Sequence, residues 1–291
     1  MVVCLGLLLA LTALVSPAHA QQQQAPPDSA MYRVETADGQ VLIGTLVSES
    51  EQEVVIDARE LGEVTVQREN IESLEKIPPD RFRDEGYWFP NPQSTRYLFA
   101  SNAIGIPEGR GYYQNTWIFF NNVNYGVSEN FSIGGGTVPV FLFGEAIFPF
   151  WVLPKLSVST PQDNVHFAAG AVIGGVLGVE DAGGASLLYG SATVGNRDHN
   201  ATLGLGYGYA DGGFTDRPAI NVSGMTRVGR TIYLISENYF FPGVEDANLI
   251  SFGLRWAPEN FAVDFALVRP LGETDGFIGL PWLGVTVPFG R

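Results

Sequence analysis

Cysteine and histidine are scarce in this sequence. Its 291 residues include one cysteine, Cys4, and three histidines. Cys4 lies in an apolar run, residues 2–15, followed by Ala18-His19-Ala20, a small-x-small pattern typical of a signal-peptide cleavage site. We therefore expect residues 1–20 to be a signal peptide, which would leave a mature chain without a thiol. Disulfides, thiolate catalysis and cysteine-based metal sites are then excluded.

Long hydrophobic runs are also missing. Beyond the leader, no stretch approaches the roughly 20 apolar residues that a transmembrane helix needs, and helical periodicity is not convincing anywhere. Yet 45% of the residues are hydrophobic, and the mean hydropathy of +0.09 is high for a soluble protein. This balance is typical of membrane β-barrels, in which only every second strand residue faces lipid.

Basic residues are the third shortage. The chain has 16 lysines and arginines against 31 aspartates and glutamates, a net charge of −15. Binding to phosphate backbones requires the opposite balance. Nucleic acid is therefore excluded as a partner.

Short, glycine-punctuated strands fill residues 97–289 instead. In segment 200–209, large apolar residues alternate with small or polar ones, so one strand face carries Leu203, Leu205, Tyr207 and Tyr209. A soluble sandwich would turn that face inward, whereas a membrane barrel would turn it toward lipid and keep a small, polar lumen.

Tight and loose connections alternate along this region. Short polar turns are expected at 126–130, 160–164, 196–200, 227–230 and 258–260. Longer links are expected at 106–110, 141–150, 177–184, 211–218, 242–247 and 270–279. Counting strands through this alternation gives about twelve, an even number with both ends on the short-turn side, as in outer-membrane barrels. We predict an all-β chain with an antiparallel transmembrane β-barrel of about twelve strands.

The remaining residues predict the domain organisation. We expect a signal peptide (1–20), a disordered Gln/Pro-rich spacer (21–30), a small periplasmic β module (31–77), a linker (78–94) and the barrel (95–291). In the β module, Asp38-Gly39 between alternating runs indicates a hairpin. The module resembles the Sm-like or SH3-like strand pattern, but its acidity argues against RNA binding. We expect a periplasmic docking or folding module, and in the docking case residues 31–77 would bind a periplasmic protein partner.

Two pieces of the larger region, residues 90–99 and 126–135, resemble uncharacterised outer-membrane β-barrel proteins of bacteria. The last segment resembles the C-terminal signal by which such barrels are recognised for insertion. Its apolar residues alternate and end on an aromatic, at Leu283, Val285, Val287 and Phe289, although Gly290 and Arg291 follow. The resemblance implies a bacterial outer-membrane location, with the small module in the periplasm. It also implies outer-membrane lipids and the barrel-insertion machinery as partners.

Four charged residues alternate with the apolar residues that would face lipid, so they are expected to point into the barrel interior. If residues 259 and 260 form a two-residue turn, Arg255 lies opposite Asp264. Together with Arg227 and Glu237, they predict a charged lumenal ladder. Its role would be either a pore lining or small-ligand site, or a salt-bridged plug that fills a narrow barrel.

Aromatic residues cluster before and in the first strands of the expected barrel. Trp and Tyr favour the membrane–water boundary. We therefore expect Tyr87, Trp88, Tyr112, Tyr113 and Trp117 to be membrane-interface aromatics, with an ordinary surface loop as the alternative for the first two.

Signals of catalysis and of metal or cofactor binding are weak. His166 and His199 have no serine or carboxylate at a catalytic spacing, and the carboxylates of the longer links lack a calcium-loop pattern. We expect no catalytic residues, no metal and no cofactor. The predicted function is a non-enzymatic envelope protein of the outer membrane, either a narrow pore or a structural barrel. An outer-membrane lipid-modifying enzyme and a secreted soluble β-barrel protein remain as alternatives.

Overall fold

The structure is a computed structural model. It describes residues 30–58, 61–83, 86–139, 144, 147–160, 162, 164–179, 183–244, 247–272 and 277–290. The predicted signal peptide and almost all of the predicted spacer lie outside these residues. The chain divides into two compact units, Met1–Tyr87 and Trp88–Arg291.

The first unit is a five-stranded antiparallel sheet. Its strands are β1 (Met31–Thr36), β2 (Val41–Glu49), β3 (Glu53–Ala58), β4 (Gly62–Gln67) and β5 (Ile71–Lys76), in the order β4-β3-β2-β1-β5. Val34, Val54 and Ile56 are completely buried and form its core. The predicted turn is present, with Gly39 at φ 83° between β1 and β2. A short pair, β6 (Phe82–Arg83) and β7 (Gly86–Tyr87), follows.

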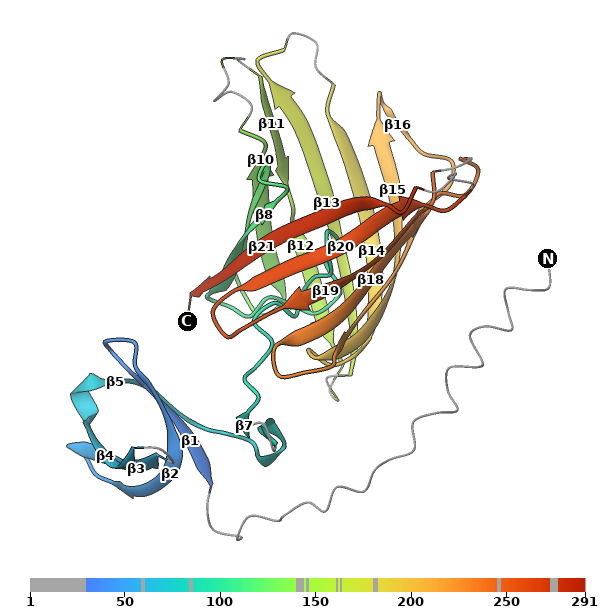
Figure 1. Ribbon diagram of the computed structural model, residues 1–291. Helices are drawn as coiled ribbons and strands as arrows, with labels where there is room; N and C mark the ends of the chain where they lie inside the picture. The colour runs from blue at the N-terminus through green and yellow to red at the C-terminus, as the bar shows by residue number, and fades with distance from the viewer. Residues whose placement is uncertain are drawn as a thin grey trace, which may run out of the picture. The chain divides into compact units, whose positions relative to one another are not determined.

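The second unit is a closed antiparallel β-barrel of twelve strands (Figure 1). Its elements are β8 (Arg110–Thr116), β9 (Phe120–Gly126), β10 (Phe131–Thr137), β11 (Phe148–Val152), β12 (Lys155–Ser159), β13 (Val165–Leu177), β14 (Ala185–Gly195), β15 (His199–Ala210), β16 (Gly213–Phe214), β17 (Ala219–Arg227), β18 (Ile232–Phe240), β19 (Leu249–Trp256), β20 (Ala262–Pro270) and β21 (Leu280–Gly290). Successive strands pair in order, and pairing of β21 with β8 closes the ring.

Two of these elements do not add strands to the count. β11 and β12 both pair with β10 and β13, so they are the two halves of one barrel strand. The strand is interrupted at Pro154, which has no N–H to give to a ladder. β16 pairs only with β15, as a short return at its end.

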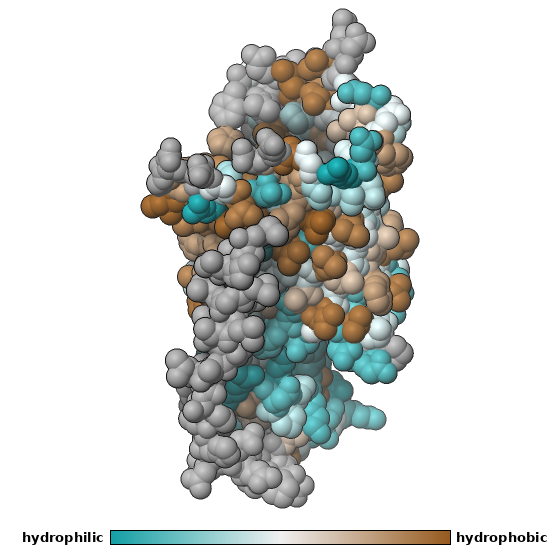
Figure 2. Space-filling view, turned by 90° about the vertical axis from the view of Figure 1, so that its right-hand side faces the viewer, coloured by the Kyte–Doolittle hydropathy of each residue, from teal (hydrophilic) through white to brown (hydrophobic). Residues whose placement is uncertain are grey.

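The barrel wall is apolar outside and polar inside. On β15, Leu203 and Leu205 are half-exposed, whereas Asn200 and Thr202 are buried in the interior. Trp256, Phe265 and Val285 also face outward. Figure 2 shows apolar side chains distributed over the visible barrel wall. The prediction that large apolar groups cover the exterior is confirmed, and the arrangement is that of a transmembrane barrel rather than a soluble sandwich. No helix in the described part of the chain is long and apolar enough to cross a membrane.

The prediction of twelve strands is confirmed, but the first two were assigned wrongly. Residues 97–105, expected to be the first strand, contain only an isolated bridge between Arg96 and Ser101. The stretch between the expected links at 106–110 and 126–130 was predicted to be one strand. It is instead a hairpin, β8–β9, which turns at Trp117 and Ile118 with φ of 51° and 70°. The expected strand at residues 97–105 is absent and the hairpin adds one strand, so the number of barrel strands remains even. The two ends of the barrel, Arg110 and Gly290, pair at the end with the tight turns.

One substitution tests the outward orientation of the barrel wall. Phe265→Arg places a charge on the lipid face, and we expect it to lower the free energy of unfolding in lipid vesicles by ~2–4 kcal/mol. Val47→Arg, at a similarly exposed residue of the first unit, should change it by less than about 0.5 kcal/mol. The measurement is a guanidinium titration of the vesicle-folded protein. Equal, small effects would mean that Phe265 faces water.

Candidate functional site

Residues 88–106 run through the inside of the barrel before the first strand begins. Apart from the Arg96–Ser101 bridge they form no ladder, yet most are deeply buried, with Tyr97 and Asn102 completely so. The segment turns tightly where the Tyr97 N–H donates to the Ala100 carbonyl at 2.9 Å. The predicted linker 78–94 therefore differs from the structure in its second half, because residues 88–94 belong to the barrel unit.

One contact to this inserted segment is a buried ion cluster. The Arg255 Nε donates to Asp264 Oδ1 at 2.5 Å, and the Arg96 Nη2 donates to Asp264 Oδ2 at 3.0 Å. All three side chains are at most 1% exposed. Arg255 also donates to the carbonyls of Gln93 (2.7 Å) and Tyr97 (2.6 Å). Two cations thus share one carboxylate. The Arg96 Nη1 also donates to the backbone carbonyls of Tyr97 and Leu98, whereas the Arg96 Nε is buried without a hydrogen-bond partner.

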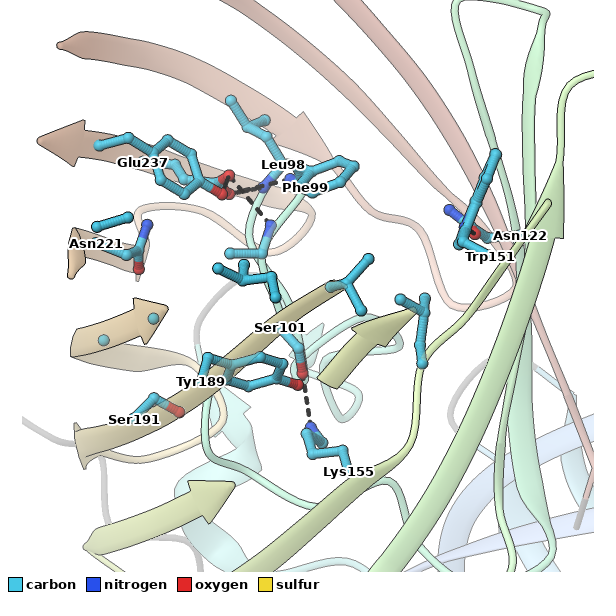
Figure 3. Close-up of a pocket in the computed structure, with 18 of the residues that line it drawn as sticks. Leu98, Phe99, Ser101, Asn122, Trp151, Lys155, Tyr189, Ser191, Asn221 and Glu237 are labelled. Atoms are coloured by element: carbon cyan, nitrogen blue, oxygen red, sulfur yellow. Dashed lines mark hydrogen bonds between the residues drawn. The ribbon is translucent and has the colours of Figure 1, made fainter. Parts of the chain in front are cut away.

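Glu237, an anion of the barrel wall, makes a second contact to the inserted segment. Its carboxylate accepts hydrogen bonds from the backbone N–H groups of Leu98 (2.8 Å), Phe99 (3.0 Å) and Ala100 (3.1 Å), as Figure 3 shows. The Tyr239 hydroxyl donates to the same carboxylate at 2.6 Å. Three consecutive N–H groups at a turn form a concave anion site, and here the anion comes from the wall.

Lys155 on β12 makes a third contact. Its Nζ donates to Ser101 Oγ at 2.7 Å and to the carbonyls of Asn102 (3.2 Å) and Ile104 (3.0 Å). All three ammonium protons therefore have acceptors in the segment. No ion pair of Lys155 is present in the described part of the chain.

Arg227 makes the fourth contact. It donates to the Phe89 carbonyl at 3.0 Å and pairs with Asp198 at 3.3 Å. Its guanidinium carbon lies 4.8 Å from the ring centre of Trp88, within the range of a cation–π contact. This anchor holds the start of the segment.

A cavity of about 470 Å³ lies between the inserted segment and the wall. Apolar and aromatic side chains such as Trp151, Val172 and Leu187 dominate its lining. Among the described residues, Lys155 and Glu237 are the only charged ones that line it. In Figure 3 these two lie at different levels, each beside the inserted segment. Cavities of this size bind small molecules.

All four residues of the predicted lumenal ladder lie in the interior. Arg255 pairs with Asp264 in the predicted register, whereas Arg227 and Glu237 make separate contacts. Arg227, Glu237 and Arg255 bind the backbone of the inserted segment, and Asp264 binds its Arg96. Sequence reasoning missed Lys155, Arg96 and the segment itself. The only available signal for Lys155 was its inward parity on a strand that also carries Leu156 and Val158 outward.

The predicted interface aromatics are only partly exposed. Tyr113 faces outward, but Trp88 and Tyr112 are buried, which contradicts a place for them at the membrane boundary. Tyr87 is also buried and belongs to the first unit, where its ring lies 6.0 Å from that of Phe82. The Trp117 ring packs against Trp282 at 4.9 Å. The four residues of the predicted insertion signal, Leu283, Val285, Val287 and Phe289, all face outward on β21.

The two described histidines each contact a hydroxyl. His166 Nδ1 lies 2.7 Å from Ser159 Oγ, and His199 Nδ1 lies 2.8 Å from Thr226 Oγ1. His166 Nε2 is buried without a hydrogen-bond partner, so no acid among the described residues orients the ring. Within the described residues no group of His, Cys, Asp and Glu could hold a metal ion. Of the acidic link residues, 180, 181, 245, 246, 273 and 275 lie outside the described residues.

No family model and no curated protein matches this chain. Among solved structures it is similar to a KdgM porin, with 9% identity and a TM-score of 0.42, over 62% of this chain and 99% of that one. It is also similar to outer membrane phospholipase A from Escherichia coli (11% identity, TM-score 0.37, 63% and 92% coverage). A third similar structure is a triple-mutant porin from Rhodopseudomonas blastica, with 11% identity and a TM-score of 0.25, over 62% of this chain and 98% of that one.

The role of Glu237 in binding the turn can be tested by hydrogen exchange of the amides of residues 98–100. Glu237→Gln keeps the shape but removes the charge and one acceptor, so the N–H groups of residues 98–100 lose partners worth about 1–3 kcal/mol. We expect their hydrogen exchange to be about ten-fold faster or more, measured by mass spectrometry. Glu108→Gln, an exposed carboxylate just after the segment, is the matched control. Unchanged exchange at residues 98–100 would contradict the role of Glu237.

Proposed function

We propose that the protein is a non-enzymatic β-barrel of the bacterial outer membrane. A structural barrel whose own inserted segment closes the lumen fits better than an open pore. The apolar exterior, the even strand number and the pairing of both barrel ends at the tight-turn side support the location. In such barrels the tight turns face the periplasm. The first unit would then lie there.

The observation that carries the proposal is the fixation of residues 88–106. A pore needs a continuous water path, but here buried side chains of both charges bind successive backbone groups of the segment. Removing one partner of such a buried charged contact costs several kcal/mol, so thermal opening of the lumen is rare. The ladder residues thus favour the plug over the pore lining.

Two surfaces would serve partners. The outward residues of β21 suit recognition by the barrel-insertion machinery, and residues 31–77 offer an acidic sheet with two open edges, β4 and β5, for a periplasmic protein. The resemblance of this unit to Sm-like modules remains a prediction.

Planar-bilayer recording tests the closed lumen. Folded wild-type protein, identified by heat-modifiable migration, should give no stepwise conductance. Glu237→Gln combined with Lys155→Gln weakens two anchors of the segment and should produce openings, while Glu108→Gln should stay silent. Steady currents from the wild type would establish the narrow pore instead.

The contact of Ser159 with His166 favours a second candidate, a lipid-modifying enzyme. A serine nucleophile needs a base in contact, which is present, and a third group that orients the base, which the described residues do not supply at His166 Nε2.

An assay with dispersed phospholipids decides between these candidates. We expect no hydrolysis above the blank. Hydrolysis that disappears in both Ser159→Ala and His166→Ala, while Thr226→Ala retains it, would establish the enzyme.

A further inference from the structure

The ladder between β18 and β19 is interrupted halfway along. Ser236 pairs with Phe252 and Tyr239 pairs with Leu249 in one continuous register, yet the two positions between them form no ladder pairs. The neighbouring ladder between β17 and β18 runs through the same depth without a gap. The neighbouring seam therefore does not share the interruption, and the interrupted positions contain no proline, unlike the break beside Pro154.

Side chains replace the missing backbone bonds. The Glu237 N–H donates to Ser251 Oγ at 3.0 Å, and this hydroxyl donates to the Glu237 carbonyl. On the other side, Ser236 Oγ donates to the Ser251 carbonyl at 2.8 Å, and the Ser251 N–H donates to Asn238 Oδ1 at 3.2 Å. All four backbone groups of this pair are satisfied, as a membrane demands. They are satisfied by side chains inserted between the strands.

Two of the inserted side chains lie on the outward parity of β18. Ser236 and Asn238 alternate there with the inward Glu237, among apolar neighbours such as Val222 and Phe252. Polar groups at membrane depth are expensive and usually functional. Ser236 and Asn238 therefore lie on the outer side of the interrupted seam.

The inner side of the seam is a wall of the cavity. Glu237 and Ser251, the interrupted pair, both line it. Two other lining groups, Trp282 Nε1 and Ser191 Oγ, are buried without hydrogen-bond partners, and the Lys155 ammonium has no carboxylate partner in the described residues. Two buried donors without partners and a cation without an ion pair in the described residues, in an apolar cavity, suit a ligand with an apolar chain and a head that accepts hydrogen bonds.

We propose that the cavity binds a single-chain carboxylate amphiphile, and that this ligand enters from the bilayer through the seam between β18 and β19. Opening the seam breaks side-chain hydrogen bonds rather than a regular ladder. The ligand chain then never has to cross the filled lumen. The inference rests on the membrane location proposed above, but not on the absence of conductance.

The test locks the seam. Ser236→Cys with Phe252→Cys places two cysteines at directly opposed positions next to the gap and leaves Asn238 and Ser251 in place. Leu203→Cys with Val222→Cys is the matched lock on an uninterrupted seam. Both are made with Trp256→Phe, which removes an outward tryptophan and leaves Trp117, Trp151 and Trp282 at the cavity.

The probe is dansyl-labelled undecanoic acid, added to vesicles containing the folded protein. Binding is followed by energy transfer from tryptophan to dansyl. We expect a fast rise in the reduced proteins, its loss in the oxidised β18–β19 lock, recovery on reduction, and no effect of the control lock. A dansyl-labelled alkylamine of the same length should give much less transfer.

Three results would overturn the inference. Equal rates in the oxidised and reduced β18–β19 lock, or equal slowing by both locks, would exclude entry through this seam. No energy transfer in any variant would exclude the ligand class. If the oxidised lock does not migrate as a folded barrel, Leu234→Cys with Leu254→Cys, the next directly opposed pair of the same parity on this seam, replaces it with the same expected loss of the fast rise. None of these results alters the conductance recordings, so the proposed function is judged separately.

Discussion

The structure depends on the need to satisfy backbone hydrogen bonds where no water and no neighbouring strand can do so. Residues 88–106 enter the barrel as irregular chain, so their N–H and C=O groups arrive without partners. The side chains of the barrel wall supply these partners: anionic groups accept from the N–H groups, and cationic groups donate to the carbonyls. Glu237 accepts from three N–H groups, while Arg255 and Lys155 donate to carbonyls. The buried charges are therefore explained by the segment, and the segment is fixed by the charges.

This logic also explains why the ions are not arranged as one ladder. Arg255 and Asp264 sit opposite one another on β19 and β20, and Arg96 of the segment adds a second cation to the same carboxylate. One carboxylate between two guanidiniums leaves a net positive charge, and backbone carbonyls of the segment accept hydrogen bonds from both arginines. Glu237 binds the amides of the segment's turn instead.

Much of the barrel could be predicted from the sequence because alternation has a fixed period of two. Leu203 and Thr202 fall on opposite faces whatever the partner strands are, and the turn between β19 and β20 sets the pairing of Arg255 with Asp264. The inserted segment could not be predicted that way. Tyr97, Leu98 and Phe99 have strand-like composition, and only tertiary contacts decide that they lie inside the wall. The turn at Trp117 and Ile118 was also hidden, because it has positive φ angles without a glycine or asparagine.

Glu237 connects the two unusual features of the barrel. Its carboxylate holds the amides of residues 98–100, and its own backbone groups bind the Ser251 hydroxyl across the interrupted seam. A shift of this residue that widens the seam must also move the carboxylate away from the inserted segment. Strands packed in a regular ladder resist such a shift together, but here the local bonds are made by side chains that can rotate. Glu237 therefore links the interrupted seam of the wall to the inserted segment, through its backbone groups on one side and its carboxylate on the other.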